Sequence, residues 1–85
     1  MAFVYSLHAL EQIKLRGLVF SIVDNVLNFP SMIVKDTDGV VIYQKLAVEG
    51  NKQYLYRVFV NSYKKPPMVI TVYKTSKIDK YENQI

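Results

Sequence analysis

The stretch from Val40 to Asn61 reads VVIYQKLAVEGNKQYLYRVFVN, two runs rich in β-branched and aromatic residues that meet at Glu49-Gly50-Asn51. Runs of this kind with a short glycine-containing break between them predict a β-hairpin. Two further β-rich runs flank the hairpin, Met32–Lys35 before it and Met68–Thr75 after it. Because short connections join successive strands, the sequence predicts an antiparallel meander with strands over about 32–35, 40–48, 52–61 and 68–75.

The residues ahead of the meander predict two short helices. Ser6 can cap a helix over about 7–16, which Gly17 ends in the left-handed conformation. Ser21 fits a capping box for a second helix over about 22–29, which Pro30 ends. Helices this short depend on docking against an apolar surface. The predicted fold class is therefore α+β, with two N-terminal helices packed on a four-stranded antiparallel sheet in a single domain, residues 1–85.

The composition limits the kinds of protein and site. The chain has 85 residues, 51% of them hydrophobic, and no cysteine, which excludes a disulfide framework and a thiolate metal site. No apolar run reaches the roughly 18 residues that a membrane span needs. The amino terminus lacks the basic region of a signal peptide, so we expect a cytoplasmic protein with no membrane partner.

The positive charge is concentrated in the second half of the chain. The net charge is +4, and residues 45–85 hold eight basic and three acidic residues. A basic half-domain is consistent with a polyanionic partner. The sequence has one histidine, no glycine-rich phosphate loop and no facing pair of carboxylates, so we expect neither a metal nor another cofactor.

Alternation along the strands predicts two different faces of the sheet. Tyr56, Val58 and Val60 share one face of the third strand, and Arg57 lies on the other. On the last strand we group Met68, Ile70 and Val72 on one face and Val69, Thr71, Tyr73 and Thr75 on the other. With the aliphatic set buried under the helices, the half-open concave face is predicted to carry Tyr43, Lys45, Arg57, Thr71, Tyr73 and Thr75.

A cationic, hydroxyl-bearing face suits RNA, whose 2′-hydroxyl is a built-in nucleophile for metal-free cleavage. Arg57 can hold a phosphate through its rigid fork, and Tyr73 can stack on a base or transfer a proton. His8 is the natural acid–base candidate, because its unperturbed pKa lies near neutrality. The catalytic candidates are His8, Arg57, Tyr73 and Thr75, and Lys45, Lys74 and Lys77 can add positive charge for RNA binding.

Each candidate also has a purely structural interpretation. Arg57 can be a solvated cross-strand partner, and Tyr73 can be an amphipathic edge of the core. His8 can pack or cap the first helix. Lys77 can protect an edge strand from pairing with other chains. The residues alone therefore predict a basic α+β domain with a polar sheet face.

Several segments resemble a known family. Ser6-Leu7-His8-Ala9, Arg16-Gly17-Leu18 and Val26–Pro30 resemble the opening motif of a small prokaryotic domain family of unknown function. That family is allied to the BrnT and RelE/ParE-like toxins of the barnase–EndoU–colicin–RelE ribonuclease group. Residues 69–77 resemble the closing strand of the same group, and the likeness covers roughly residues 5–81.

The resemblance implies a microbial-ribonuclease-like fold and a toxin–antitoxin endoribonuclease that needs no metal and is held by a cognate antitoxin. By position, it implies roles for His8 and Arg16 on the first helix, Arg57 on the central strand, and Tyr73, Thr75 and Lys77 on the last strand. His8 and Arg16 lie about 12 Å apart along a helix, so we interpret Arg16 as the more structural of the two.

Two other functions stay open at this point. The first is a non-catalytic module with the same fold that binds a protein, and the second is an RNA-binding module that does not cut. Homodimerisation is left open as well.

Overall fold

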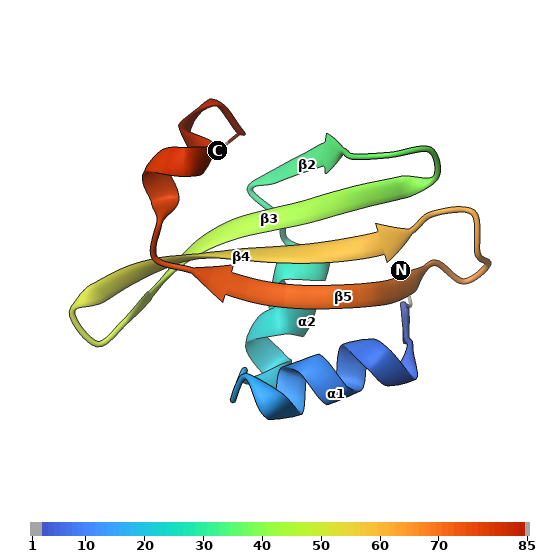
Figure 1. Ribbon diagram of the computed structural model, residues 1–85, viewed down its shortest axis with the longest axis horizontal. Helices are drawn as coiled ribbons and strands as arrows, with labels where there is room; N and C mark the ends of the chain where they lie inside the picture. The colour runs from blue at the N-terminus through green and yellow to red at the C-terminus, as the bar shows by residue number, and fades with distance from the viewer. Residues whose placement is uncertain (1–2, 85) are drawn as a thin grey trace.

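A computed structural model of the chain describes residues 3–84, with the side chains of residues 3–81. It contains one five-stranded sheet in the order β1-β5-β4-β3-β2 (Figure 1). Strands β2 to β5 form the antiparallel meander, and β1 pairs in parallel with β5. The strands are β1 (Val4–Tyr5), β2 (Met32–Lys35), β3 (Val40–Glu49), β4 (Lys52–Asn61) and β5 (Met68–Thr75).

The prediction of four antiparallel strands was therefore wrong in one respect, although the α+β class is confirmed. The additional strand β1 has two residues, which is too short for an alternating pattern to reveal. It pairs through Val4 with Met68 and through Tyr5 with Val69, and its parallel direction makes the sheet mixed. This pairing joins the two ends of the chain, so only the folded structure can show it.

The first helix, α1 (Leu7–Leu15), begins and ends as the sequence predicts. The Ser6 Oγ accepts a hydrogen bond from the backbone N–H of Ala9 at 3.0 Å. Gly17 has φ +63°, a left-handed conformation that favours glycine. Local residues alone therefore define this helix.

The second helix, α2 (Phe20–Asn28), begins two residues earlier than predicted. Its N-cap is Val19, without a side-chain capping bond, so Ser21 lies inside the first turn and the predicted capping box is wrong. The backbone N–H of Leu18 bonds to the carbonyl of Ile13 at 2.9 Å, and the Leu18 side chain is buried. Because the Leu18 side chain is buried directly after α1, the chain enters α2 before it reaches Ser21. The side-chain cap that Ser21 could provide is therefore not used.

The main core lies between the helices and one face of the sheet (Figure 1). The prediction for β4 is confirmed, because Tyr56, Val58 and Val60 all belong to this core. The helices contribute Ala9, Ile13, Val23, Val26 and Leu27.

On β5 the predicted alternation fails at a β-bulge. Phe59 pairs with Thr71 but the next residue, Val60, pairs with Val69, so Ile70 is an extra residue. As a result Val69 and Val72 share the helix-covered face. The predicted grouping of Val69 with Tyr73, and of Met68 with Val72, was wrong for this reason.

The predicted face of β3 was also wrong. Tyr43 pairs with Val58, and Lys45 pairs with Tyr56, so both lie on the helix-covered face. Directly paired residues of antiparallel strands point to the same side, and the register with β4 decides the side. None of the helices in the described part of the chain has the length and apolar character that crossing a bilayer requires.

The last element is a 3-10 helix, η1 (Ile78–Gln84), where the sequence indicated only a polar tail. In Figure 1 it follows the end of β5 and turns back towards β3 and β2. This brings the C-terminal segment beside the face of the sheet opposite α1 and α2, which we call the open face.

Candidate functional site

Arg57 and Tyr73 lie side by side at the centre of the open face, on the paired strands β4 and β5. The Arg57 Nη1 donates a hydrogen bond to the Tyr73 hydroxyl at 2.6 Å. The Arg57 Nε donates to Gln44 Oε1, also at 2.6 Å, from the neighbouring strand β3. The prediction that Arg57 and Tyr73 share a face is therefore confirmed, and the fork of the guanidinium is held in one orientation.

The open face is not free at Arg57, contrary to the prediction. Arg57 is 8% exposed and Gln44 is fully buried, although no α-helix covers this side. The ring of Tyr81, from η1, lies 4.3 Å from the guanidinium carbon of Arg57, and its hydroxyl lies 3.1 Å from that of Tyr73. The chain's own C-terminal segment thus covers the guanidinium through a cation–π contact.

A second guanidinium approaches Tyr73 from the side of α1. The guanidinium carbon of Arg16 lies 5.9 Å from the centre of the Tyr73 ring, and Arg16 is exposed. Its Nε donates to Gln12 Oε1 at 2.6 Å, one turn earlier on the helix. Helix α1 runs along β5, so Arg16 at its end lies near enough to approach the Tyr73 ring of that strand (Figure 1). We call Arg16, Arg57, Tyr73 and Tyr81 the arginine–tyrosine cluster.

The two tyrosines of the cluster differ in acidity. Burial raises the pKa of Tyr73, and its hydrogen bond to Tyr81 raises it further. The same hydrogen bond lowers the pKa of Tyr81, and the positive charge of Arg57 acts in the same direction. Tyr73 therefore keeps its proton more firmly, while Tyr81 is the group that releases one more readily.

The other residues predicted on the last strand and the first helix lie outside the cluster. The Thr75 Oγ1 accepts a hydrogen bond from the backbone N–H of Lys77 at 3.0 Å, so its side chain fixes the turn after β5. The Lys77 side chain is exposed. His8 is exposed in the first turn of α1, about 12 Å along the helix axis from Arg16. The structure therefore does not place the predicted acid–base histidine at the cluster.

The predicted RNA-binding lysines of β3 and β5 lie on the helix-covered side of the sheet. The Lys45 Nζ donates to Asn25 Oδ1 at 2.9 Å, on helix α2. Lys74 pairs with Glu49 at 2.7 Å, and its Nζ also lies 4.6 Å from the centre of the Tyr54 ring. Neither lysine contributes its charge to the cluster, so the prediction that Lys45 lies on the open face was wrong.

Two residues of this site were absent from the sequence prediction. Tyr81 lies in a polar tail with no strand or α-helix pattern, and it meets Arg57 only because η1 folds back. Gln44 faces Arg57 because of the register between β3 and β4. Gln44 alternates with the apolar Ile42 and Leu46 on one face of β3, which was a signal, since a buried polar side chain needs a hydrogen-bonding partner.

The fold and the cluster define a small α+β protein in which Arg57 and Tyr73 of the sheet meet Arg16 from the end of α1 and Tyr81 from η1. Comparison of this chain with protein-family models, curated proteins and solved structures finds no match. Among the described residues, no three His, Asp or Glu side chains lie close enough together to hold a metal ion.

Proposed function

We propose that this protein acts on RNA, as a toxin-type endoribonuclease allied to the BrnT and RelE-like group, and cleaves by 2′-hydroxyl attack without a metal. One observation carries the proposal. Two guanidinium groups lie near Tyr73: that of Arg57 donates a hydrogen bond to the Tyr73 hydroxyl, which also meets the Tyr81 hydroxyl, and that of Arg16 lies 5.9 Å from the centre of the Tyr73 ring. Arginine forks recognise phosphate, and phenol groups can transfer protons, so the cluster brings together the two requirements of this reaction.

Each residue of the cluster then has a role that follows from its position. Arg16 is exposed and contacts the phosphate first, and the positive charge of Arg57 offsets the negative charge that develops on the phosphoryl oxygens of the pentacoordinate transition state. Tyr81, whose pKa is lowered, acts in its deprotonated phenolate form and takes the proton of the 2′-hydroxyl as that oxygen attacks the phosphorus. Tyr73, whose pKa is raised, is protonated at neutral pH and donates to the departing 5′-oxygen.

The cover over Arg57 sets a condition on this mechanism. Since Arg57 is 8% exposed and the Tyr81 ring lies over it, Arg57 acts from beneath the ring as a fixed positive charge, and direct contact with RNA would require the ring to turn aside. The same observation favours a second candidate, a non-catalytic module that binds RNA or a protein through the remaining exposed residues. In the toxin proposal, the protein partner is an antitoxin, whose acidic residues would complement the net charge of +4.

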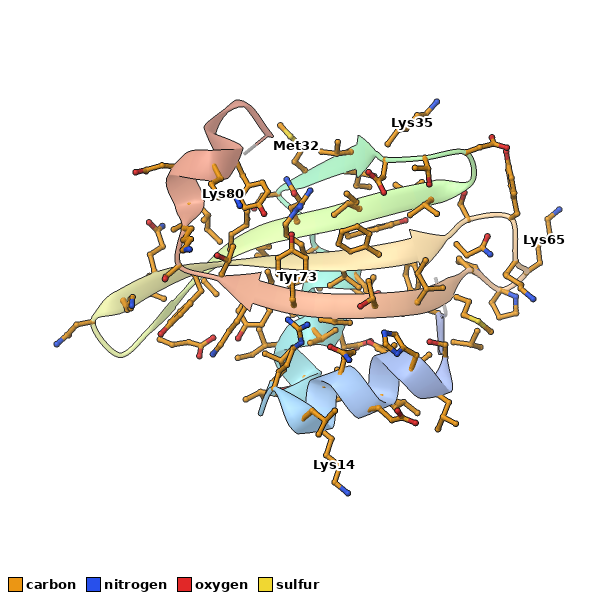
Figure 2. All side chains as sticks on the ribbon, viewed as in Figure 1. Lys14, Met32, Lys35, Lys65, Tyr73 and Lys80 are labelled. Atoms are coloured by element: carbon orange, nitrogen blue, oxygen red, sulfur yellow. The ribbon has the colours of Figure 1, made fainter. Side chains whose placement is uncertain are left out.

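The test compares two substitutions on α1 that remove the same charge. Arg16 points at Tyr73, whereas Lys14 is exposed and points away from the sheet (Figure 2). Purified protein is incubated with total RNA in EDTA, and the products are separated on a gel. We expect the wild type and Lys14→Ala to cleave alike, and Arg16→Ala to cleave about tenfold more slowly, which corresponds to about 1.4 kcal/mol.

A third variant separates cleavage from binding. Tyr81→Phe removes one hydroxyl and keeps the ring over Arg57, so we expect cleavage to be lost while RNA binding remains. A wild-type protein that binds RNA without cutting it supports the binding module. A protein that neither cuts nor binds RNA refutes the proposal in both forms.

A further inference from the structure

Beyond the arginine–tyrosine cluster, the open face continues along β4 and β5 towards the loop of residues 62–67. We propose that this part of the open face binds single-stranded RNA, with Phe59 as the platform on which an unpaired base stacks. The proposal rests on the proposed RNA-directed function and names the form of RNA and a residue that selects it. Phe59 takes no part in the cleavage chemistry described above.

Phe59 lies next to the cluster and is only partly covered. It is two residues beyond Arg57 on β4, so the two side chains share the open face. Its ring centre is 6.0 Å from that of Tyr73, with 32° between the planes, and 5.5 Å from the guanidinium carbon of Arg57. Phe59 and its cross-strand partner Thr71 are both half-buried. An aromatic ring therefore adjoins the phosphate-binding groups.

The η1 segment leaves this part of the face uncovered. In Figure 1, η1 stands near the end of β5, while the loop of residues 62–67 lies at the opposite end of the sheet. Exposure varies along the open face: Leu55 and Arg57 are buried at 0% and 8%, and Ile42, which pairs with Phe59, is buried at 2%. Phe59, Asn61 and Thr71 are half-buried. The part of the Phe59 ring that remains exposed is therefore accessible to a base.

The charges along this path are those that an RNA backbone needs. No Asp or Glu lies among the residues of β3, β4 and β5 that share this face with Arg57. Positive charge lies at one end, in the cluster, and at the other end in the exposed Lys64 and Lys65 of the loop, of which Figure 2 labels Lys65. Asp38 also lies at this end, where it accepts a hydrogen bond from Tyr63. From Arg57 to Asn61 the strand extends about 13 Å at roughly 3.3 Å per residue. A short run of nucleotides can thus bridge the two basic ends.

The aromatic platform selects single strands over duplexes. A base can lie on the Phe59 ring only if one of its faces is free, and both faces are already stacked within a double helix. A platform flanked by cations is the arrangement by which proteins hold single-stranded nucleic acid. A duplex can still meet the loop lysines, but it cannot use Phe59.

The experiment measures binding apart from cleavage. The probe is a fluorescein-labelled 2′-O-methyl oligoribonucleotide of mixed sequence, which cannot be cut by 2′-hydroxyl attack, used alone or annealed to its complement. Binding is followed by fluorescence anisotropy in EDTA. We expect the single strand to bind at least about tenfold more tightly than the duplex. Loss of one stacked base is worth about 1–3 kcal/mol, so Phe59→Leu should weaken single-strand binding about 5- to 150-fold.

Two variants control for the substitution itself. Phe29→Leu makes the same change at an exposed phenylalanine at the end of α2, and it should leave the affinity unchanged. Phe59→Tyr keeps an aromatic ring and should bind within about twofold of the wild type. A 2-aminopurine base placed in the probe should lose fluorescence when it stacks on Phe59 of the wild-type protein. This measurement detects the stacking contact without any substitution.

The outcomes separate this inference from the proposed function. Equal affinity for single strand and duplex overturns it, as does equal affinity of Phe59→Leu and Phe29→Leu, or an unquenched 2-aminopurine in the complex. If any of these occurs while Arg16→Ala still weakens binding, the RNA-directed function stands and only the platform is refuted. If the wild type binds neither probe, the proposed function fails as well.

Discussion

Removing one oxygen atom from the cluster tests its geometry directly. Tyr73→Phe keeps the ring and deletes the hydroxyl, which accepts a hydrogen bond from Arg57 at 2.6 Å and meets the Tyr81 hydroxyl at 3.1 Å. Arg57 is 8% exposed, so water cannot freely replace the lost acceptor. The substitution therefore removes one hydrogen-bond acceptor from a charged donor without opening a large cavity.

The expected cost follows from the burial of this hydrogen bond. A hydrogen bond to a fully buried charged group contributes about 1.5–3 kcal/mol to stability, and partial exposure lowers this contribution. Because Tyr73 is only half-buried and Arg57 keeps its bond to Gln44, we expect a loss of about 1 kcal/mol. For a domain of this size, that lowers Tm by about 4–8 °C.

The pKa of Tyr81 gives a second readout that stability alone does not. Its hydrogen bond with Tyr73 is the main cause that lowers this pKa, so Tyr73→Phe should raise it towards the ordinary tyrosine value. The assays are thermal unfolding followed by circular dichroism and an NMR titration of ¹³Cζ-labelled tyrosine. The control is Tyr43→Phe, a half-buried tyrosine that packs edge-on against Phe3. If Tyr73→Phe melts like the control and leaves the Tyr81 pKa unmoved, the cluster is not formed as described.

Two further substitutions test other parts of the structure. Hydrogen bonds, first from Lys74, lower the pKa of Glu49. The stabilisation by this carboxylate is thus present above the unfolded carboxyl pKa of about 4.3 and is lost as the pH falls through the folded value. Glu49→Gln should therefore shrink the difference in Tm between about pH 6 and about pH 3, and an unchanged difference would contradict this. The Tyr5 hydroxyl is buried and makes no hydrogen bond of ordinary geometry to a described residue, although the Asp24 carboxylate is close enough to contribute to its pKa. Tyr5→Phe should therefore match or exceed wild-type stability, by up to about 1 kcal/mol in urea unfolding. Burial raises the pKa of Tyr5 to about 12, so the wild type should lose more stability than the variant as the pH rises from about 10 to about 12.

The strands and the first helix could be predicted because their signals are local. The predicted bounds of β4 and β5 match the structure, since glycine, proline and asparagine in the connections interrupt long β-rich runs. Ser6 and Gly17 act on residues within one turn of themselves, so the limits of α1 could be derived from neighbouring residues. Side-chain alternation is also a local signal, and it correctly placed Arg57 and Val58 on opposite faces of β4.

The site could be predicted only in part, because its composition depends on contacts between distant segments. The register of β3 against β4 put Tyr43 and Lys45 beneath the helices, and one extra residue, Ile70, shifted the faces of β5. A register shift of one residue moves every following side chain of the strand to the opposite face, and the local sequence pattern does not reveal such a shift.

By itself, then, the amino-acid sequence determined the order of the two α-helices and of strands β2 to β5, the basic second half and the shared face of Arg57 and Tyr73. The tertiary structure alone decided that Arg16 reaches Tyr73 from the end of α1 and that Tyr81 folds back over Arg57. The physical reason is that hydrogen bonds within a turn and alternation along a strand act between neighbours in the chain. Strand register, the parallel pairing of β1 and the return of η1 depend instead on the packing of the whole molecule.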